Sequence, residues 1–220
     1  MHACLVPVKE LSQAKERLAP LLDRADRRRL TLAMLADVLD TAQASAALDL
    51  IAVVSRDDEA LAAARDAGAL PLKEADGVWG LNAALEFARR RLRLESASQL
   101  LVLPCDIPLL APADVASLVD AVARAPSVAL VPSPNGGTNA LAMSPADLIA
   151  FRFGRRSASA HREEARRAAA DFRRLDLPRL ALDIDTPADL LRLASRARDG
   201  RTADLLRSLP LPARSAAEGA

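Results

Sequence analysis

Short apolar runs alternate along the chain with longer stretches in which apolar residues recur at helical spacing. The runs predict strands at Ala3–Val8, Leu50–Ser55, Ala69–Leu72, Leu100–Pro104, Val128–Pro132 and Leu180–Ile184. The stretches between them predict helices at Arg27–Ala44, Asp58–Ala67, Leu81–Leu94 and Pro112–Ala123. Strands that alternate with helices are typical of βαβ units. We therefore expect an α/β fold with a mostly parallel sheet flanked by helices.

Three similar phrases predict helix starts. They read Ala111-Pro112-Ala113-Asp114, Ser144-Pro145-Ala146-Asp147 and Thr186-Pro187-Ala188-Asp189. Each places proline at the first helical position and aspartate in the first turn. Their spacing is too irregular for a repeat protein. A further helix is predicted at Ser157–Arg174, with its arginines mainly on a solvated face.

Length and composition favour a single domain. The 220 residues are 51% hydrophobic, which allows a substantial core to be buried. The helical pattern fades beyond Arg198. We therefore expect the domain to span residues 1–197, and residues 198–220 to form a helical remnant followed by a disordered tail. Antiparallel pairing of edge strands into a homodimer is left open.

The charge balance argues against a nucleic-acid or membrane partner. The net charge is +1 although 27% of the residues are charged, so no global field attracts a polyanion. No uncharged stretch approaches the roughly 18 residues that span a bilayer. Cys4 and Cys105 indicate neither a disulfide framework nor a zinc cluster. We expect a cytoplasmic protein that recognises small ligands.

Aspartates follow two of the predicted strands. Asp106 comes directly after the fourth strand, and Asp183 and Asp185 lie on one side at the end of the sixth. Open α/β sheets bind ligands at the carboxyl ends of their strands. These carboxylates therefore predict a Mg²⁺ site that bridges to phosphate oxygens. The alternative is that they cap the helices that follow.

The loop after the first strand is basic. Lys9, Lys15 and Arg17 lie just beyond the strand and can embrace a triphosphate together with backbone N–H groups. No Walker-type glycine pattern is present. The alternative is an ordinary solvated loop.

Two glycine-containing segments are candidates for ligand contact. The Gly136–Gly137 pair permits close backbone approach, so that Thr138 and Asn139 can bind phosphate or carboxylate oxygens. A plain hairpin turn is the competing interpretation. The other segment contains Trp79, the single tryptophan of the chain, and Asn82, which can read a base edge from a helix start.

The chain shows no sign of a hydrolytic triad. Only His2 and His161 supply imidazoles, and neither has an evident serine or cysteine nucleophile beside it. A phosphorylated acid is largely dianionic at neutral pH, because its second pKa is about 6. It needs no protein base to become a nucleophile, and metals and lysines suffice to support its attack.

A set of short motifs spans Leu5 to Leu193 in a fixed order. They are Pro7-Val8-Lys9 with Ala14-Lys15-Glu16-Arg17-Leu18-Ala19-Pro20, Val53-Val54-Ser55, Gly80-Leu81-Asn82-Ala83-Ala84-Leu85, Pro104-Cys105-Asp106-Ile107-Pro108-Leu109, Gly136-Gly137-Thr138-Asn139-Ala140-Leu141, Phe153-Gly154 with Ser157 and His161, and Leu182-Asp183-Ile184-Asp185-Thr186-Pro187. The ordered set resembles the 2-phospho-L-lactate and phosphoenolpyruvate guanylyltransferases of coenzyme F-420 biosynthesis.

This resemblance implies a nucleotide-diphospho-sugar transferase-like (Rossmann-like) fold. It also implies transfer of GMP from GTP to a three-carbon phospho-acid, with Mg²⁺ as cofactor and release of pyrophosphate. The implied residues are Lys15 and Asp106 in catalysis, Pro7, Lys9, Lys15, Arg17, Ser55, Gly80 and Asn82 at the nucleotide, Thr138, Gly154 and Ser157 at the acceptor, and Asp106, Asp183 and Asp185 at the metal. The next transferase of the pathway, which accepts a labile product, is an implied partner.

One motif departs from the family pattern. Relatives usually read Phe-Gly-Pro-Gly-Ser-Phe at residues 153–158, whereas this chain has Arg155 and Arg156 in place of the Pro-Gly pair. The acceptor therefore stays open among phosphoenolpyruvate, 2-phospho-L-lactate and 3-phospho-D-glycerate. The rival activities are another nucleotidyltransferase of the same fold, of the molybdopterin guanylyltransferase or sugar-phosphate type, and a non-catalytic nucleotide-binding regulator. The first rival usually carries a glycine-rich loop where Pro7-Val8-Lys9 stands here.

Overall fold

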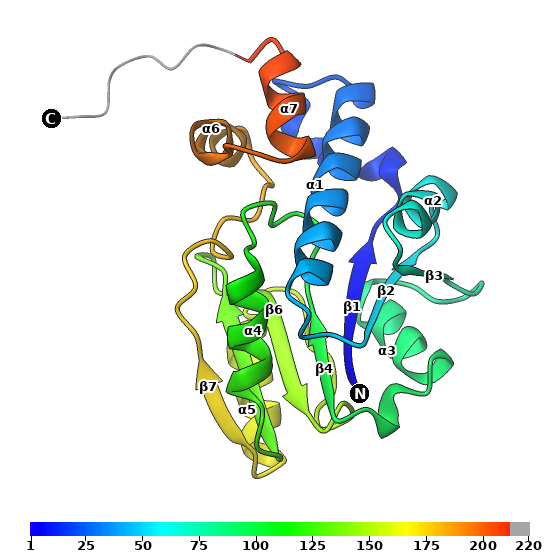
Figure 1. Cartoon of the computed structure of the whole chain (residues 1–220), viewed down its shortest axis with the longest axis vertical. Coiled ribbons are helices and arrows are strands. Elements are labelled where there is room, and N and C mark those ends of the chain that lie inside the picture. Colours follow the sequence, from blue (N-terminus) through cyan, green and yellow to red (C-terminus); the bar gives the residue numbers. More distant parts are fainter. Residues whose placement is uncertain (212–220) are drawn as a thin grey trace, which may run out of the picture.

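Seven strands and seven α-helices follow one another in residues 1–211, the part of the chain that the computed structural model describes (Figure 1). The strands are β1 His2–Val8, β2 Leu50–Ser55, β3 Leu70–Lys73, β4 Gln99–Val102, β5 Ser127–Pro132, β6 Thr138–Ser144 and β7 Asp171–Arg174. The α-helices are α1 Arg24–Ala44, α2 Asp58–Asp66, α3 Leu81–Arg91, α4 Pro112–Ala121, α5 Ser157–Arg167, α6 Pro187–Arg196 and α7 Arg201–Ser208. Short 3-10 helices lie in the loops at η1 Leu11–Gln13, η2 Glu16–Leu18 and η3 Leu94–Ser96.

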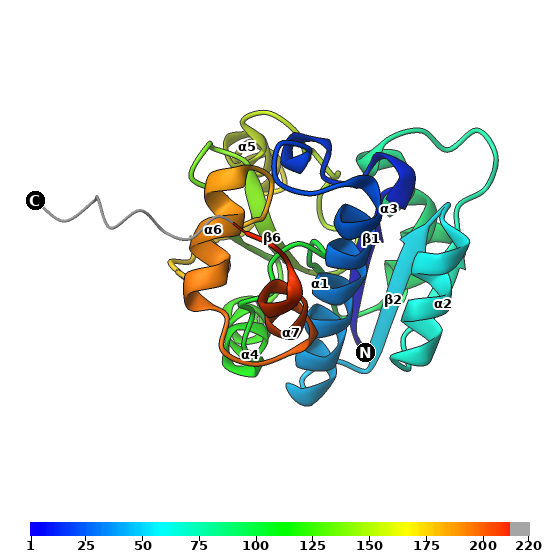
Figure 2. The same ribbon diagram turned by 90° about the horizontal axis from the view of Figure 1, so that it is seen from above.

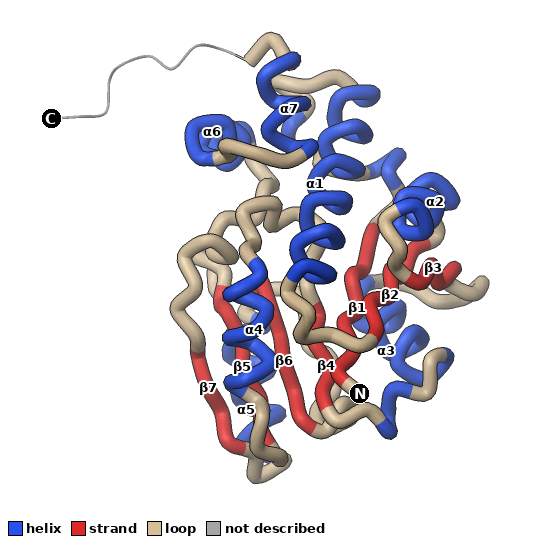
Figure 3. Tube along the Cα trace, viewed as in Figure 1, coloured by secondary structure: helices blue, strands red, loops and turns tan. Residues whose placement is uncertain are grey.

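All these strands belong to one sheet, in the order β3-β2-β1-β4-β6-β5-β7 (Figure 3). The pairs β1 with β2, β1 with β4, β2 with β3, and β5 with β7 are parallel. Strand β6 runs against both of its neighbours, because it follows β5 through a tight hairpin. The expected mostly parallel sheet is thus confirmed, and the parallel strands end at one common edge.

Side chains of the central strands alternate between two helical layers. On β1, Cys4 and Val6 face a cluster formed with α1, α2 and α4, whereas Ala3 and Leu5 face α3 and α5. Seen from above, α1 and α4 lie on one side of the sheet and α3 and α5 on the other (Figure 2). Because both faces are covered, these strands are apolar throughout, as buried parallel strands are.

A third apolar cluster lies beyond the carboxyl edge of the sheet and joins α1, α6 and α7. Its members include Leu30 and Met34 of α1, Leu190 and Leu193 of α6, and Leu205 and Leu206 of α7. The helical remnant expected beyond Arg198 is α7 itself. The expected domain boundary at residue 197 is therefore wrong, because α7 is packed into the same domain. The disorder expected further on falls largely on residues 212–220, outside the described residues.

Most of the predicted elements are confirmed to within a few residues. Helices α4 and α6 begin at Pro112 and Pro187, as the two proline phrases predict. The third phrase does not start a helix, because Ser144 ends β6 and the chain turns at Pro145. Within residues 1–211, none of the helices combines the length and apolar character that crossing a membrane requires.

Two other predicted elements are wrong. The run Leu180–Ile184 is not a strand, because Leu182 and Ile184 are buried in the third cluster instead of pairing with the sheet. The helix predicted over Ser157–Arg174 ends at Arg167, and its last residues form the edge strand β7. Strand β6 was not predicted. The Gly136–Gly137 pair lies in the hairpin between β5 and β6, and ligand contact by Thr138 and Asn139 stays a prediction.

Candidate active site

Lys15 joins the two acidic segments. Its Nζ donates to Asp106 Oδ2 and, over 2.9 Å, to Asp185 Oδ1. The Lys15 side chain is only 9% exposed. Its backbone has a φ of 53°, in the left-handed region that non-glycine residues rarely adopt. Such strain is typical of functional sites, where the surrounding structure holds the residue in place.

A backbone hydrogen bond aligns the second acidic segment with the first. Asp106 follows β4, and its carbonyl oxygen accepts from Ile184 N over 3.1 Å. The side chains of Leu182 and Ile184 are buried, whereas Asp183 and Asp185 are half-buried on the other side of the segment. The alternation predicted for a strand is therefore present without a strand, and it turns both aspartates towards Asp106.

The charges of this group are strongly coupled. Burial lowers the pKa of the Lys15 ammonium, but the carboxylates of Asp106 and Asp185 outweigh burial and raise the pKa above its usual value. Burial raises the pKa of Asp185, but the charge of Lys15, followed by those of Arg17 and Lys9, holds the pKa below its usual range. At neutral pH Lys15 is thus a cation, and it cannot serve as a general base.

Asp183 lacks a cation of its own. Burial raises its pKa, and the nearby carboxylates of Asp106 and Asp185 raise it further, while a hydrogen bond from Asn139 Nδ2 over 3.2 Å opposes the shift. Such crowding of oxygen donors is relieved when a hard cation binds. Within residues 1–211, however, no three carboxylate, imidazole or thiol groups are arranged as a ready-made metal site. The donor chemistry fits Mg²⁺, and the metal ligands stay a prediction.

A cavity of about 500 Å³ opens at this edge of the sheet. Its lining includes six predicted residues, namely Pro7, Lys9, Lys15, Gly80, Asp106 and Asp185. Its volume lies in the range of roughly 300–1,000 Å³ that is common for small-ligand sites. Arg56 and Glu74 also line the cavity and were not predicted, and Trp79 lines it as part of the glycine-containing segment that is a candidate for ligand contact. Arg56 and Glu74 directly follow two predicted strands, which is the signal that could have found them.

Three residues predicted at the nucleotide, namely Ser55, Arg17 and Asn82, lie outside the cavity lining. Ser55 is fully buried, and its Oγ accepts from Asp57 N over 3.0 Å, so it shapes the turn after β2. Arg17 is exposed and acts on Asp185 through its charge. Neither side chain is therefore among the groups that line the cavity.

Asn82 is engaged in a different contact from the predicted one. Its Nδ2 donates to Phe153 O over 3.0 Å, and its Oδ1 accepts from Phe153 N over 2.8 Å. Both ends of the Asn82 amide are thus bonded to backbone, and one N–H and one lone pair of Oδ1 are left over. Asn82 fixes the segment that leads into Gly154.

The three predicted acceptor residues lie at the start of α5 and of β6. Ser157 Oγ donates to Thr138 Oγ1 over 3.0 Å, and Ser157 N donates to Gly154 O over 3.2 Å. Gly154 has a φ of 133°, which an L-residue rarely adopts, and open space surrounds the position of a Cβ there. Asn139, next to Thr138, bonds to Asp183 and so connects this group with the carboxylates.

His161 completes the acceptor group. Arg152 N donates to His161 Nε2 over 3.0 Å, so the proton of the neutral imidazole is on Nδ1. Nδ1 lies 3.1 Å from Thr138 Oγ1 and donates to it. Thr138 Oγ1 thus accepts two hydrogen bonds, which leaves its own hydrogen for a ligand. The sequence contained a signal, because Ser157 and His161 are four residues apart and share one face of a helix.

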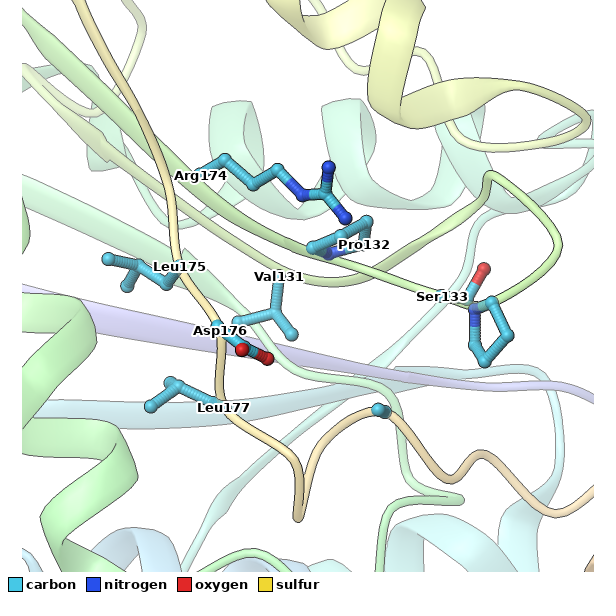
Figure 4. Close-up of a pocket in the computed structure, with 9 residues that line it drawn as sticks. Val131, Pro132, Ser133, Arg174, Leu175, Asp176 and Leu177 are labelled. Atoms are coloured by element: carbon cyan, nitrogen blue, oxygen red, sulfur yellow. The ribbon is translucent and has the colours of Figure 1, made fainter.

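A second cavity of about 430 Å³ lies at the carboxyl ends of β5 and β7 (Figure 4). Its lining residues are Val131, Pro132, Ser133, Pro134, Arg174, Leu175, Asp176, Leu177 and Ala181. None of the predicted site residues is among them. We place the active site in the larger cavity, where Lys15 and Asp106 lie.

Solved structures share this fold. A protein of Desulfovibrio desulfuricans G20 assigned to the nucleotide-diphospho-sugar transferases is similar with a TM-score of 0.72 at 19% identity, over 94% of each chain. A nucleotidyl transferase of Methanothermobacter thermautotrophicus is similar with a TM-score of 0.64 at 17% identity, over 94% of this chain and 99% of that one. The similarity defines the class of the fold, which is nucleotide-diphospho-sugar transferase-like.

The sequence narrows this class to one family. Residues 2–218 match the family described as guanylyl transferase, CofC like, and the chain belongs to that family. A phosphoenolpyruvate guanylyltransferase of Rubrobacter xylanophilus is 43% identical over 86% of this chain and 91% of its own length. A 2-phospho-L-lactate guanylyltransferase of Methanothermobacter thermautotrophicus is 34% identical over 95% of this chain and 92% of its own length.

Proposed function

We propose that this protein transfers GMP from GTP to a three-carbon phospho-acid and releases pyrophosphate, as a step of coenzyme F-420 biosynthesis. The observation that carries the proposal is the cavity in which Lys9, Lys15, Asp106 and Asp185 lie together. Asn139, next to Thr138, donates to Asp183, whose charge is coupled to the Asp106 and Asp185 carboxylates of the cavity. The cavity thus combines lysines with carboxylates, and the acceptor group offers the hydroxyl of Thr138.

In the proposed reaction, a phosphate oxygen of the acceptor attacks the α-phosphorus of GTP. A new P–O bond forms to the α-phosphorus, the bond between it and the oxygen bridging to the β-phosphorus breaks, and pyrophosphate leaves. The acceptor phosphate is already largely ionised at neutral pH, so no protein base is required. Lys15 stays charged because of its neighbours and stabilises the negative charge that develops in the transition state.

The acceptor group supplies orientation. Because His161 and Ser157 both donate to Thr138 Oγ1, the Thr138 hydroxyl is left to donate to a phosphate or carboxylate oxygen. The open backbone at Gly154 lets an anion approach closely. Correct orientation of two bound reactants lowers the barrier by several kcal/mol.

We further propose that Asp106, Asp183 and Asp185 hold Mg²⁺. Carboxylate oxygens are ligands that suit this ion. When bound, Mg²⁺ would neutralise phosphate charge. The support is the unneutralised crowding around Asp183.

Phosphoenolpyruvate is the first acceptor to test, because the 43% identical relative bears its name. The relative named for 2-phospho-L-lactate is 34% identical. Arg155 and Arg156 are exposed beside Gly154, so 3-phospho-D-glycerate, a more polar acid, stays in the proposal. We propose the cytoplasm as the compartment and the next transferase of the pathway as the recipient of the product.

The test incubates the protein and Mg²⁺ with each nucleoside triphosphate and each of the three acids. The labile product is trapped by the next transferase and identified by mass. GTP with one of the acids is expected to yield product and pyrophosphate. Silence in every combination would overturn the proposal and favour a nucleotide-binding regulator.

Asp106→Asn tests whether the Asp106 carboxylate is needed for the proposed GMP transfer. The expected result is an unchanged circular-dichroism spectrum with a loss of pyrophosphate release of at least roughly 100-fold, because one charge of the site is removed. Normal turnover by the folded variant would contradict the role of Asp106.

A further inference from the structure

The larger cavity has a second polar group at its other end. Arg56 follows β2 and Glu74 follows β3, and both line the cavity. Arg56 Nε donates to Glu74 Oε2 over 3.0 Å, and Glu74 N donates to Ser55 O over 2.9 Å, which keeps the two side chains together. The side chains of Arg56 and Glu74 are 26% and 12% exposed, so the pair is largely shielded from solvent.

This pair has unused hydrogen-bonding capacity. Arg56 Nη2 is buried and has no hydrogen-bond partner among the described residues. The second carboxylate oxygen of Glu74 accepts no hydrogen bond from the described residues. A buried donor without an acceptor costs about 1–3 kcal/mol. A ligand that offers an acceptor next to donors would satisfy both groups at once.

Trp79 provides an apolar surface beside the pair. The guanidinium of Arg56 lies over the Trp79 ring, 4.2 Å from its centroid. Trp79 is also 76% exposed, which is unusual for so large an apolar residue. A planar ligand ring whose edge forms hydrogen bonds with Arg56 and Glu74 would lie roughly in the plane of the guanidinium. The indole that already stacks on the guanidinium then covers that ring as well.

The position of this group suits a nucleotide. Adjacent strands are about 5 Å apart, and β2 and β3 are the first and second neighbours of β1 in the sheet. The Arg56–Glu74 pair therefore lies roughly one to two strand spacings, about 5–10 Å, from the β1 end that carries Lys9. Lys9 and Lys15, the cations proposed to face the phosphates, line the same cavity as the Arg56–Glu74 pair.

We propose that Arg56, Glu74 and Trp79 form the guanine-recognition subsite of the enzyme, an inference that rests on the proposed use of GTP. Glu74 accepts from the N1–H and the 2-amino group of guanine, Arg56 donates to O6, and Trp79 stacks on the base. Adenine presents an amino donor in place of O6 and an unprotonated N1, so it meets donor with donor and acceptor with acceptor. Inosine keeps O6 and N1–H and lacks only the 2-amino group.

The first experiment uses the fluorescence of Trp79, which is the single tryptophan of the chain. The full-length protein is titrated with GTP, ITP and ATP. We expect quenching by all three, with affinity in the order GTP, ITP, ATP. Quenching requires no turnover, so it separates a failure of the guanine subsite from a failure of GMP transfer. Unchanged fluorescence under GTP, where calorimetry shows binding, would overturn the stacking role.

The second experiment measures GMP, IMP and AMP transfer by two variants. Glu74→Gln keeps the size of the side chain and its contact with Arg56, and is expected to reduce the preference for GTP over ATP by roughly 10- to 100-fold and to bring GTP and ITP closer together. Trp79→Ala is expected to raise the KM of all three nucleotides by a similar factor, because stacking does not distinguish the purines.

Asp76→Asn is the matched control, because Asp76 is an exposed carboxylate of the same loop that does not line the cavity. It is expected to leave the nucleotide ratios unchanged. If folded Glu74→Gln keeps the wild-type ratio of GTP to ATP while wild type transfers GMP, the guanine subsite is wrong and the proposed function stands. If wild type transfers no nucleotide to any acceptor, the proposed function fails instead.

Discussion

Single residues in this site have roles that depend on the protonation state of a neighbour. Lys15 is held as a cation by Asp106 and Asp185, and the hydroxyl of Thr138 is oriented by a neutral imidazole at His161. A protonated imidazole would have no lone pair to accept from Arg152 N. The acceptor group therefore depends on keeping His161 uncharged.

This dependence predicts a pH effect on stability. Burial lowers the pKa of His161 to about 4, with Arg152 acting in the same direction and Glu164 opposing it. The unfolded chain takes up this proton near pH 6.5, so between these values it binds more protons than the folded chain. Stability is therefore complete above about pH 6.5 and falls as the pH falls towards 4. From pH 8 to pH 5 the expected loss from this group is about 2 kcal/mol.

Urea unfolding of wild type and of His161→Gln at several pH values measures this effect. The variant carries no titrating group at position 161. The unfolding free energy of wild type relative to the variant should therefore fall by about 2 kcal/mol from pH 8 to pH 5. His2→Gln removes the other imidazole of the chain and serves as control. Parallel pH profiles for wild type and His161→Gln would contradict the lowered pKa.

At the scale of elements, the start of α5 accommodates an unfavourable residue. Arg156 is the N-cap of α5 and has a φ of 58°, in the left-handed region. Glycine adopts such a φ without a steric penalty. The left-handed conformation at Arg156 leads directly into Ser157, the first residue of α5, whose Oγ donates to Thr138 Oγ1 over 3.0 Å.

Arg156→Gly is therefore expected to raise the free energy of unfolding by up to about 1 kcal/mol, because relief of the strained conformation exceeds the added entropy of the unfolded chain. Chemical denaturation of the purified variant measures this difference. Arg156→Ala keeps the Cβ and loses the charge. An equal gain from Arg156→Ala would assign the effect to charge instead of backbone strain.

The docking of α7 on α1 is a second feature at the scale of secondary-structure elements. Asp37 of α1 accepts from Arg201 N over 2.8 Å and from Thr202 N over 2.9 Å, so a side chain from a distant helix caps the start of α7. Gly200, with a φ of 100°, makes this approach possible, since a Cβ there would lie 2.9 Å from Asp37 Oδ1. The leucines of α7 then reach the third apolar cluster.

Asp37→Ala is expected to lower the free energy of unfolding by about 1–2 kcal/mol, as the loss of an N-terminal cap does. Thermal or urea unfolding provides the measurement. Asp40→Ala is the matched control, because Asp40 makes only an exposed ion pair with Arg201, and such pairs contribute about 1 kcal/mol or less. Equal losses for both variants would refute the capping role.

At the scale of the whole molecule, the sheet order sets where a nucleotide lies. The strands β3, β2, β1 and β4 are consecutive neighbours, and their carboxyl ends carry Glu74, Arg56, Lys9 and Asp106. In the proposed complex, the guanine, the phosphates and the carboxylates would therefore follow one line along this edge. The acceptor group lies past β4, where β6 and α5 begin.

This arrangement predicts that bound GTP and Mg²⁺ stabilise the whole fold against unfolding. GTP with Mg²⁺ at about 100 times its Kd is expected to add roughly 2.7 kcal/mol, which for a domain of this size raises Tm by about 5–10 °C. GTP alone should give a smaller shift, and EDTA should abolish turnover until Mg²⁺ is restored. Full activity in EDTA would exclude the proposed metal.

Much of this architecture could be predicted from local patterns. The apolar runs of β1, β2, β4 and β5 and the helical periods of α1 to α4 depend on neighbouring residues, so they are legible in the sequence. Strand β7 could not be predicted, because its exposed, charged residues at the sheet edge show no apolar pattern. Leu182 and Ile184 misled for the opposite reason: their alternation is real, but helices bury them and no strand pairs with them.

The sequence by itself determined which residues carry charge and that Asp106, Asp183 and Asp185 stand at the ends of apolar segments. Only the tertiary structure decided that Lys15 lies between two of them, that Asn82 binds backbone, and that Arg56 pairs with Glu74. The physical reason is distance along the chain. Periodicity reports which face of an element is buried, whereas a contact between residues 91 positions apart, such as Lys15 with Asp106, depends on how the strands are ordered in the sheet.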